Sequence, residues 1–220
     1  MFQNNYRSFM PAVTPVVMNI IIINVIMFLL TLLKESFMVE KFALFYFGSP
    51  WFEPYQFVSH MFMHGGFTHL FFNMYTLFFF GTALERVWGS KKFLIYYLFT
   101  GIGAALLHNG VQFLEALRFE AAGDILSLEF LNMTPTVGAS GAIYGLLLAY
   151  GMLFPNDRIM LLIPPIPMKA KYFVIIFGVL ELLLGLSNPG SSIAHFAHLG
   201  GMLFGLVLIL YWKKNNKMYY

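Results

Sequence analysis

The sequence predicts an all-α, polytopic membrane protein built as a bundle of six transmembrane helices. Of its 220 residues, 59% are hydrophobic and only 10% are charged, and the mean hydropathy is +0.73. So few charges cannot cover the surface of a water-soluble protein of this size. The apolar residues fall in runs close to the roughly 20 residues that a helix needs to cross a bilayer. Cysteine is absent, which excludes disulfides and thiol nucleophiles.

Six apolar segments make up one predicted membrane domain covering residues 1–220. They lie at residues 13–33, 68–87, 93–111, 140–154, 172–186 and 193–212. The first follows Arg7 and ends at the charged pair Lys34-Glu35, where a signal peptide would carry a small-residue cleavage site. We therefore expect a retained membrane anchor. The second span opens on a histidine-rich stretch, the fourth stops at Pro155, and the fifth contains Glu181.

The distribution of Lys and Arg predicts that both termini are cytoplasmic. In that orientation the cytoplasmic segments hold ten basic residues, which are Arg7, Arg86, Lys91, Lys92, Arg158, Lys169, Lys171, Lys213, Lys214 and Lys217. Only Lys34, Lys41 and Arg118 fall outside. The two longest connecting segments, residues 34–67 and 112–139, then lie on the outer side of the membrane.

Polar residues gather at the start of the even-numbered spans, which enter the membrane from its outer side in this topology. These turns lie at a similar depth and hold His64, His69, Asn73, Ser140, His195 and His198. Polar groups are costly inside a bilayer and by default suggest a functional site. The clustering therefore predicts such a site near the outer face.

The fourth span is unusually short. From Ser140 to Pro155 it has about 15 residues, or roughly 22 Å of helix, against a hydrocarbon core of about 30 Å. Ser140 would then lie below the outer surface, directly after a non-helical stretch at residues 135–139. Irregular backbone is tolerated at that depth only when it is buried in protein or lines a wet cavity. We therefore expect a water-filled recess that opens to the outer face.

Ser140 is the candidate nucleophile and His198 the candidate base. A serine hydroxyl becomes reactive when a base accepts its proton and the oxyanion formed on the substrate is stabilised. The start of a helix supplies free N–H groups and a positive dipole end for that oxyanion. Gly138 and Gly141 beside the serine leave room for a substrate and for neighbouring helices.

Other residues near the two candidates would bring them together. Gly201 and Gly205 follow His198 at the small-xxx-small spacing that lets membrane helices approach closely, and the fourth span has glycines at the same spacing. Tyr144 lies one turn after the candidate nucleophile on the same helical face, where its ring can pack against an imidazole. These features predict contact between the fourth and sixth spans.

Taken singly, these residues also have ordinary explanations. Serine and glycine are common packing residues between membrane helices, and His69 and Asn73 at i and i+4 can form an interhelical hydrogen-bond patch. Metal binding by His64, His69 and His198 is another alternative, although no carboxylate accompanies them at the outer ends of their helices. Their combination at one depth favours catalysis.

The chain resembles the rhomboid family of intramembrane serine proteases in four stretches, which are SHMFMHGGFTHLFFN (59–73), ERVWGS (85–90), GASGAIYG (138–145) and AHLGG (197–201). The resemblance extends over essentially all six spans and implies the six-helix rhomboid fold. It implies a catalytic dyad of Ser140 and His198. His69 and Asn73, with the backbone N–H of the serine, would stabilise the oxyanion.

The resemblance assigns supporting roles as well. His64 matches a histidine associated with structure and the polar cavity, and Tyr144 matches the residue against which the catalytic imidazole packs. Gly138, Gly141 and Gly201 belong to the matching motifs. No cofactor, metal ion or nucleic acid is expected.

The function implied is that of a serine endopeptidase which cleaves transmembrane or membrane-proximal segments of membrane proteins. Its substrates would be single-span proteins in the lipid bilayer, and its active site would open to the outer face. The bare six-span form suggests a bacterial inner (plasma) membrane. Two alternatives are a catalytically inactive rhomboid-like protein that binds membrane clients, and a small channel or transporter with a proton path through Glu181 and the histidines.

Some residues depart from the family pattern. Many bacterial members have a Trp-Arg pair in the first outer segment, where this chain has Tyr55-Gln56. For Glu181 we expect a protonated or hydrogen-bonded side chain against a neighbouring helix, with a role in substrate gating as the alternative. We expect no third carboxylate to orient His198, because Glu85 and Asp157 fall at the opposite face; His195, His60 and His108 are expected to be supporting or interfacial.

Overall fold

The computed structural model describes residues 12–160, 166–187 and 195–216. Arg7 and Lys217, which contributed to the predicted orientation, lie outside these ranges, as do the first two residues of the predicted span 193–212. Within them the chain forms helices and one antiparallel pair of short strands, in which Ile159 faces Met168.

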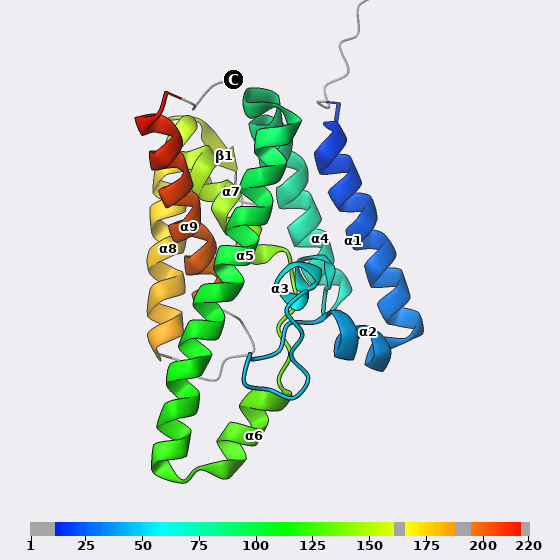
Figure 1. Ribbon diagram of the computed structural model, residues 1–220. Coiled ribbons are helices and arrows are strands. Elements are labelled where there is room, and N and C mark those ends of the chain that lie inside the picture. Colours follow the sequence, from blue (N-terminus) through cyan, green and yellow to red (C-terminus); the bar gives the residue numbers. More distant parts are fainter. Residues whose placement is uncertain (1–11, 161–165, 188–194, 217–220) are drawn as a thin grey trace, which may run out of the picture.

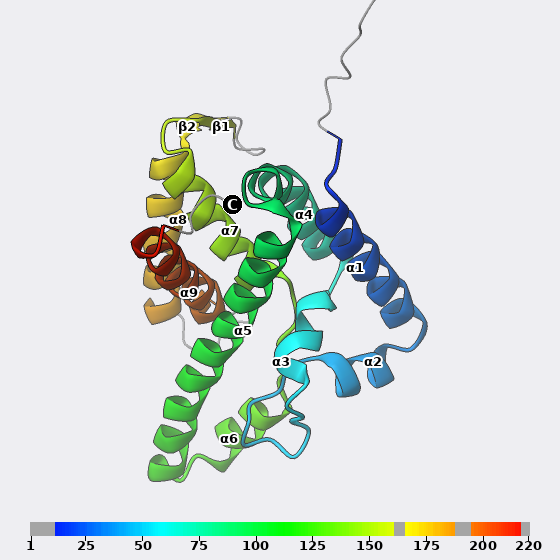
Figure 2. The same ribbon diagram turned by 45° about the horizontal axis from the view of Figure 1, so that its top comes forward.

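The helices pack together in one bundle, shown in Figures 1 and 2. In chain order the elements are α1 (Pro15–Leu33), α2 (Glu35–Phe42), α3 (Gln56–Ser59), the 3-10 turn η1 (His60–Phe62), α4 (Phe67–Thr76), the π-helical turn η2 (Leu77–Gly81), α5 (Thr82–Ala122), α6 (Ile125–Met133), α7 (Ser140–Leu153), β1 (Arg158–Met160), β2 (Pro167–Lys169), α8 (Ala170–Ser187) and α9 (His195–Lys214).

Four described helical stretches are long and apolar enough to cross a membrane: α1, the run Phe67–Ala122, α8 and α9. As one straight helix the 56-residue run would extend about 84 Å, far beyond a hydrocarbon core of roughly 30 Å. It is broken at Gly89, where φ is 74° and ψ is 160°. Figure 1 shows α4 lying beside α5 after this reversal, which fits the two predicted spans 68–87 and 93–111. The polytopic helical membrane fold is thus observed, whereas six crossings, which also require the 14-residue α7, stay a prediction.

The predicted outer segments contain more helix than expected. Residues 34–67 hold α2, α3 and η1, and α5 continues to Ala122, well past the predicted end of its span at residue 111. It stops because Gly123 adopts a left-handed conformation, after which the Asp124 side chain accepts a hydrogen bond from Ser127 N–H at 3.1 Å and caps α6. Figure 1 shows this end of α5, with α6, projecting beyond the lower ends of α8 and α9.

Gln56, of the Tyr55-Gln56 pair, is fully buried in the first of the predicted outer segments. Its Oε1 accepts a hydrogen bond from Phe45 N–H at 3.3 Å, and its Nε2 donates to Trp51 O at 3.0 Å. Tyr55 is exposed. Gln56 thus satisfies backbone groups that would otherwise be unpaired, and it fixes the shape of this segment.

Helices α5, α7 and α9 pack closely at the centre of the bundle because small residues line their contacts. A Cβ atom added to Gly201 would lie 1.8 Å from Gly141 O, and one added to Gly141 would lie 2.5 Å from Ala104 Cβ. Tyr96 donates a hydrogen bond from its hydroxyl to Gly145 O at 2.9 Å. The predicted contact between the spans that carry Ser140 and His198 is therefore present, and it depends on backbone-to-backbone approach.

Glu85 joins the start of α1 to α5 through hydrogen bonds of its carboxylate. Its carboxylate accepts hydrogen bonds from Val16 N–H and Val17 N–H at 3.1 and 3.0 Å, and from Ser90 Oγ at 2.6 Å. It therefore satisfies the free N–H groups at the start of α1 and also holds the residue after the Gly89 break. This structural role agrees with the prediction that Glu85 lies away from His198.

Candidate active site

Ser140 and His198 meet at the start of α7 and α9. Ser140 is the first residue of α7, and His198 lies in the first turn of α9. The distance between His198 Nε2 and Ser140 Oγ is 2.8 Å, which is a hydrogen bond. The structure thus brings together the two residues that the sequence put forward as nucleophile and base.

Gly138 gives the approach to Ser140 its shape. Its φ of 131° lies in a region that L side chains rarely adopt, and a Cβ atom there would lie 2.8 Å from both Cε1 and Nε2 of His69. The backbone just before Ser140 therefore passes directly against the His69 ring. A side chain at position 138 would strain the backbone and displace that ring.

Tyr144 supports the imidazole from below, as its position one turn after Ser140 predicts. Its ring stacks on the His198 ring with centroids 4.2 Å apart and planes only 6° from parallel. Its hydroxyl donates a hydrogen bond to Glu181 Oε1. Tyr144 therefore links the imidazole of α9 to a carboxylate on α8.

Glu181 contradicts the expectation that no third carboxylate orients His198. Its Oε1 lies 3.0 Å from His198 Nδ1, and its Oε2 lies 2.6 Å from His195 Nδ1. All three side chains are buried. The expectation that Glu181 bonds to a neighbouring helix is correct, and the partner includes the imidazole at the centre of the site. His195, expected to support the site, holds the second oxygen of the same carboxylate.

The two predicted oxyanion-stabilising residues lie around Ser140. Asn73 lines the same cleft as Ser140, and its Nδ2 donates to His69 O at 3.0 Å. The buried ring of His64 meets that of His69 edge-on, with centroids 4.9 Å apart. His69 and His64 therefore form an imidazole pair near Ser140, and Asn73 lines the cleft.

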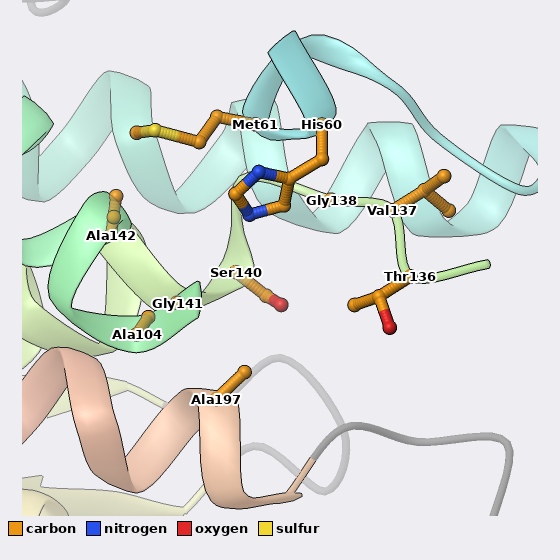
Figure 3. Close-up of a pocket in the computed structure, with 11 residues that line it drawn as sticks. His60, Met61, Ala104, Thr136, Val137, Gly138, Ser140, Gly141, Ala142 and Ala197 are labelled. Atoms are coloured by element: carbon orange, nitrogen blue, oxygen red, sulfur yellow. The ribbon is translucent and has the colours of Figure 1, made fainter. Parts of the chain in front are cut away.

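Two cavities reach Ser140. The larger, about 260 Å³, lies between α4, η2, α7 and α8, and its lining includes Asn73, Phe80 and Phe173. The smaller, about 20 Å³, also borders Ser140, which Figure 3 shows between the His60 ring and Ala197. A space of this size suits about one water molecule.

His60 borders the smaller cavity as a neutral side chain. Burial lowers the pKa of His60 to about 4, and its Nδ1–H donates to Gln56 O at 2.8 Å. A neutral imidazole with one ring nitrogen so engaged presents a polar edge without a charge. His108, the other predicted interfacial histidine, pairs through Nε2 with Thr136 Oγ1 at 3.0 Å.

A metal site of the kind considered from sequence is not found in the described part of the chain. His64, His69 and His198 do not form a convergent group there, whereas ligand atoms of Glu181, His195 and His198 lie within 4.8 Å of one another. The carboxylate of this second group already contacts both imidazoles directly. Its donor atoms are thus engaged with each other.

Comparison with known proteins agrees with the sequence motifs. The model of the Rhomboid domain family matches residues 51–215. The rhomboid protease AarA of Providencia stuartii is 31% identical over 155 residues, covering 67% of this chain and 52% of that protein. Rhomboid protein 1, mitochondrial, of Saccharomyces cerevisiae is 29% identical over 157 residues, which cover 71% and 41% of the two chains. The putative rhomboid protease YdcA of Bacillus subtilis is 31% identical over 158 residues, covering 71% and 66%. The chain thus spans about half or less of the first two relatives.

Proposed function

Because the matched domain takes up most of its length, this chain belongs to the rhomboid family, and we propose that it is an intramembrane serine protease with Ser140 as nucleophile. The observation that carries the proposal is the 2.8 Å hydrogen bond between Ser140 Oγ and His198 Nε2. Relatives named as rhomboid proteases support it. An inactive relative would be expected to lack this pairing.

The geometry supports an acyl-transfer mechanism. Ser140 Oγ attacks the carbonyl carbon of the scissile peptide bond while His198 Nε2 takes the hydroxyl proton. The carbonyl electrons form an oxyanion, for which the Ser140 N–H, His69 and Asn73 are the donors on hand. When the C–N bond breaks, His198 gives its proton to the leaving amine. Water then attacks the acyl-enzyme by the same proton transfers and releases Ser140.

The cleft beside Ser140 suits a segment of a membrane protein. It runs between α4 and α8, with aromatic side chains from both helices and from η2 around the polar end at Asn73 and Ser140. An apolar strand of polypeptide can lie in such a cleft while one peptide bond reaches the serine. A substrate helix must unwind locally to do so, which favours single-span proteins with helix-destabilising residues near the outer membrane surface.

We place the site on the outer side of a bacterial inner membrane, with both termini cytoplasmic. The asymmetry of Lys and Arg supports this orientation. The alternative of a channel gains no support from Glu181, because its carboxylate contacts His195 and His198 close to Ser140.

The experiment is labelling of the purified, folded chain with a fluorophosphonate, which reacts with activated serines. We expect labelling of the wild type and cleavage of a fluorogenic single-span reporter in liposomes. Both should be lost in Ser140→Ala. Ser187→Ala, which changes an exposed serine at the end of α8, is the matched control and should behave as wild type. Absence of labelling in the folded wild type, or its persistence in Ser140→Ala, would refute the proposal.

A further inference from the structure

We propose that Glu181 completes a Ser140–His198–Glu181 triad, in which its carboxylate positions the imidazole that activates the serine. The inference rests on the proposed function and adds a third member to the expected dyad. Glu181 does not touch the substrate in this arrangement. It is a positioning residue that acts through His198.

The three groups form a continuous series across three helices. Glu181 Oε1 on α8 lies 3.0 Å from His198 Nδ1 on α9, and His198 Nε2 lies 2.8 Å from Ser140 Oγ on α7. The carboxylate and the hydroxyl thus sit at the two different nitrogens of one ring. In this arrangement a carboxylate at Nδ1 can fix the orientation and tautomer of the ring while Nε2 takes the serine proton.

The imidazole needs a partner at Nδ1. To accept the serine proton at Nε2, the neutral ring must carry its own proton on Nδ1, and that atom is buried. Among the described residues, no partner of Nδ1 meets the directional requirements of a hydrogen bond. The 3.0 Å approach of Glu181 Oε1 is therefore a close contact, which becomes an ion pair when the ring is protonated. Catalytic hydrogen bonds in unliganded sites are often poorly aligned and tighten when the substrate binds.

Glu181 is itself held firmly. The Tyr144 hydroxyl donates to Oε1, and His195 Nδ1 lies 2.6 Å from Oε2. Tyr144 also stacks on the face of the His198 ring, while Glu181 lies at its Nδ1 edge. The imidazole is therefore positioned by two side chains that are hydrogen-bonded to each other. A carboxylate inside a membrane span is costly unless it is paired, and these contacts supply the pairing.

The carboxylate also serves the charge that develops during the reaction. When His198 takes the serine proton it becomes an imidazolium, and a carboxylate 3.0 Å away stabilises that cation. The other titratable groups near the ring are Tyr144, His195, His69 on α4 and His108 on α5. Tyrosine and histidine side chains become negative only by losing a proton. None of these four therefore replaces the negative charge of Glu181 near neutral pH.

The test compares Glu181→Gln with wild type in the full chain, using the rate of fluorophosphonate labelling of Ser140 as a function of pH. Glutamine keeps the size of the side chain but removes its charge, and its amide can donate to Nδ1 and so favour the wrong tautomer. We expect the labelling and cleavage rates to fall by roughly 10²- to 10⁴-fold. The midpoint of the acid limb of the rate should move to lower pH by about one unit or more.

Matched controls separate this role from a structural or gating one. Glu129→Gln, an exposed carboxylate on α6, should leave the rate and its pH dependence unchanged. Loss of a mere tether between α8 and α9 would lower the thermal midpoint in detergent without moving the pH curve. A gating role would change the KM of the reporter and leave the labelling rate by the small probe intact. The triad needs no metal ion, so activity should persist in a chelator; loss of activity there would point instead to a metal held by Glu181, His195 and His198.

The outcomes are distinct from those of the Ser140 experiment. If the wild type labels and Glu181→Gln labels at the same rate with the same pH curve, the triad is wrong while the protease proposal stands. If Glu181→Gln does not fold, Glu181→Asp decides, because it keeps the charge but withdraws it by one methylene. The triad then predicts a reduced rate with the wild-type pH midpoint, and an unchanged rate would overturn it.

Discussion

Gly201→Ala tests whether the active site depends on the close contact of α7 and α9. The new Cβ atom would lie 1.8 Å from Gly141 O and 2.7 Å from Gly141 C, both backbone atoms that cannot rotate away. It falls roughly 1.5 Å or more short of ordinary van der Waals separation. The two helices must therefore move apart by about that distance near the ends that carry Ser140 and His198.

That displacement acts directly on the pair of candidate catalytic residues. Ser140 lies one residue before Gly141 on α7, and His198 lies three residues before Gly201 on α9. Adding about 1.5 Å to their 2.8 Å separation breaks the hydrogen bond. We expect a loss of about 1–3 kcal/mol in the free energy of unfolding from overpacking, and a loss of activity of about 10²-fold or more from misplacement.

The assay combines thermal unfolding in detergent with the rate of fluorophosphonate labelling. Gly110→Ala on α5 is the matched control, because a Cβ atom there meets nothing within 4 Å. It should be neutral or slightly stabilising, by up to about 1 kcal/mol, since alanine favours a helix over glycine. Wild-type stability and labelling in Gly201→Ala would show that the contact between α7 and α9 is looser than its geometry indicates.

Two further predictions concern topology and pH. Because the chain has no cysteine, Glu129→Cys and Asn156→Cys introduce single labels; in intact cells a membrane-impermeant maleimide should modify only the former, and the reverse pattern would refute the orientation. The pKa of His60 is about 4 in the folded protein and about 6.5 in the unfolded chain. Between these pH values the unfolded state binds more protons, so the free energy of unfolding decreases as the pH falls from 6.5 to 4. His60→Gln keeps a hydrogen-bond donor near Gln56 O and should reduce this pH-dependent loss of stability, which is on the order of 3 kcal/mol. Thermal melts at several pH values measure it, and an equally steep loss in the variant would contradict a neutral, buried His60.

The parts of the site that depend on local spacing could be predicted from the sequence. The interval between Ser140 and Tyr144 is one helical turn, so their shared face follows from helix geometry alone. The meeting of Ser140 with His198 followed from small residues at regular intervals and from a common depth. These inferences need only the period of a helix and the direction in which each span runs.

The partner of Glu181 could not be found in the same way. Helix α8 is apolar on nearly every side, so its sequence gives no stripe that fixes which face meets α9. One signal was available: Glu181 and His198 each lie within about two turns of the ends of consecutive antiparallel helices, which suggests similar depth. Depth alone leaves the rotation of α8 open, and rotation decides whether the carboxylate reaches the imidazole.

The helical content of the predicted outer segments was underestimated for a different reason. Hydropathy marks where a helix leaves the membrane, not where it ends, and α5 keeps its hydrogen-bonding pattern beyond residue 111 until Gly123 stops it. The glycine is visible in the sequence as a helix terminator. The charged residues that precede it, such as Glu115 and Arg118, favoured a connecting segment only because they are polar.

The glycine at position 138 can help to separate active from inactive homologues in sequence data. Two independent restrictions exclude every side chain there, because the backbone adopts a φ of 131° and the His69 ring lies where a Cβ atom would go. Homologues that keep the equivalent of Ser140 but have lost this glycine should therefore lack hydrolytic activity. A search for the serine alone would count them as active. Surveys of sequence databases could use the glycine as a diagnostic character for separating working members of the lineage from degenerate ones.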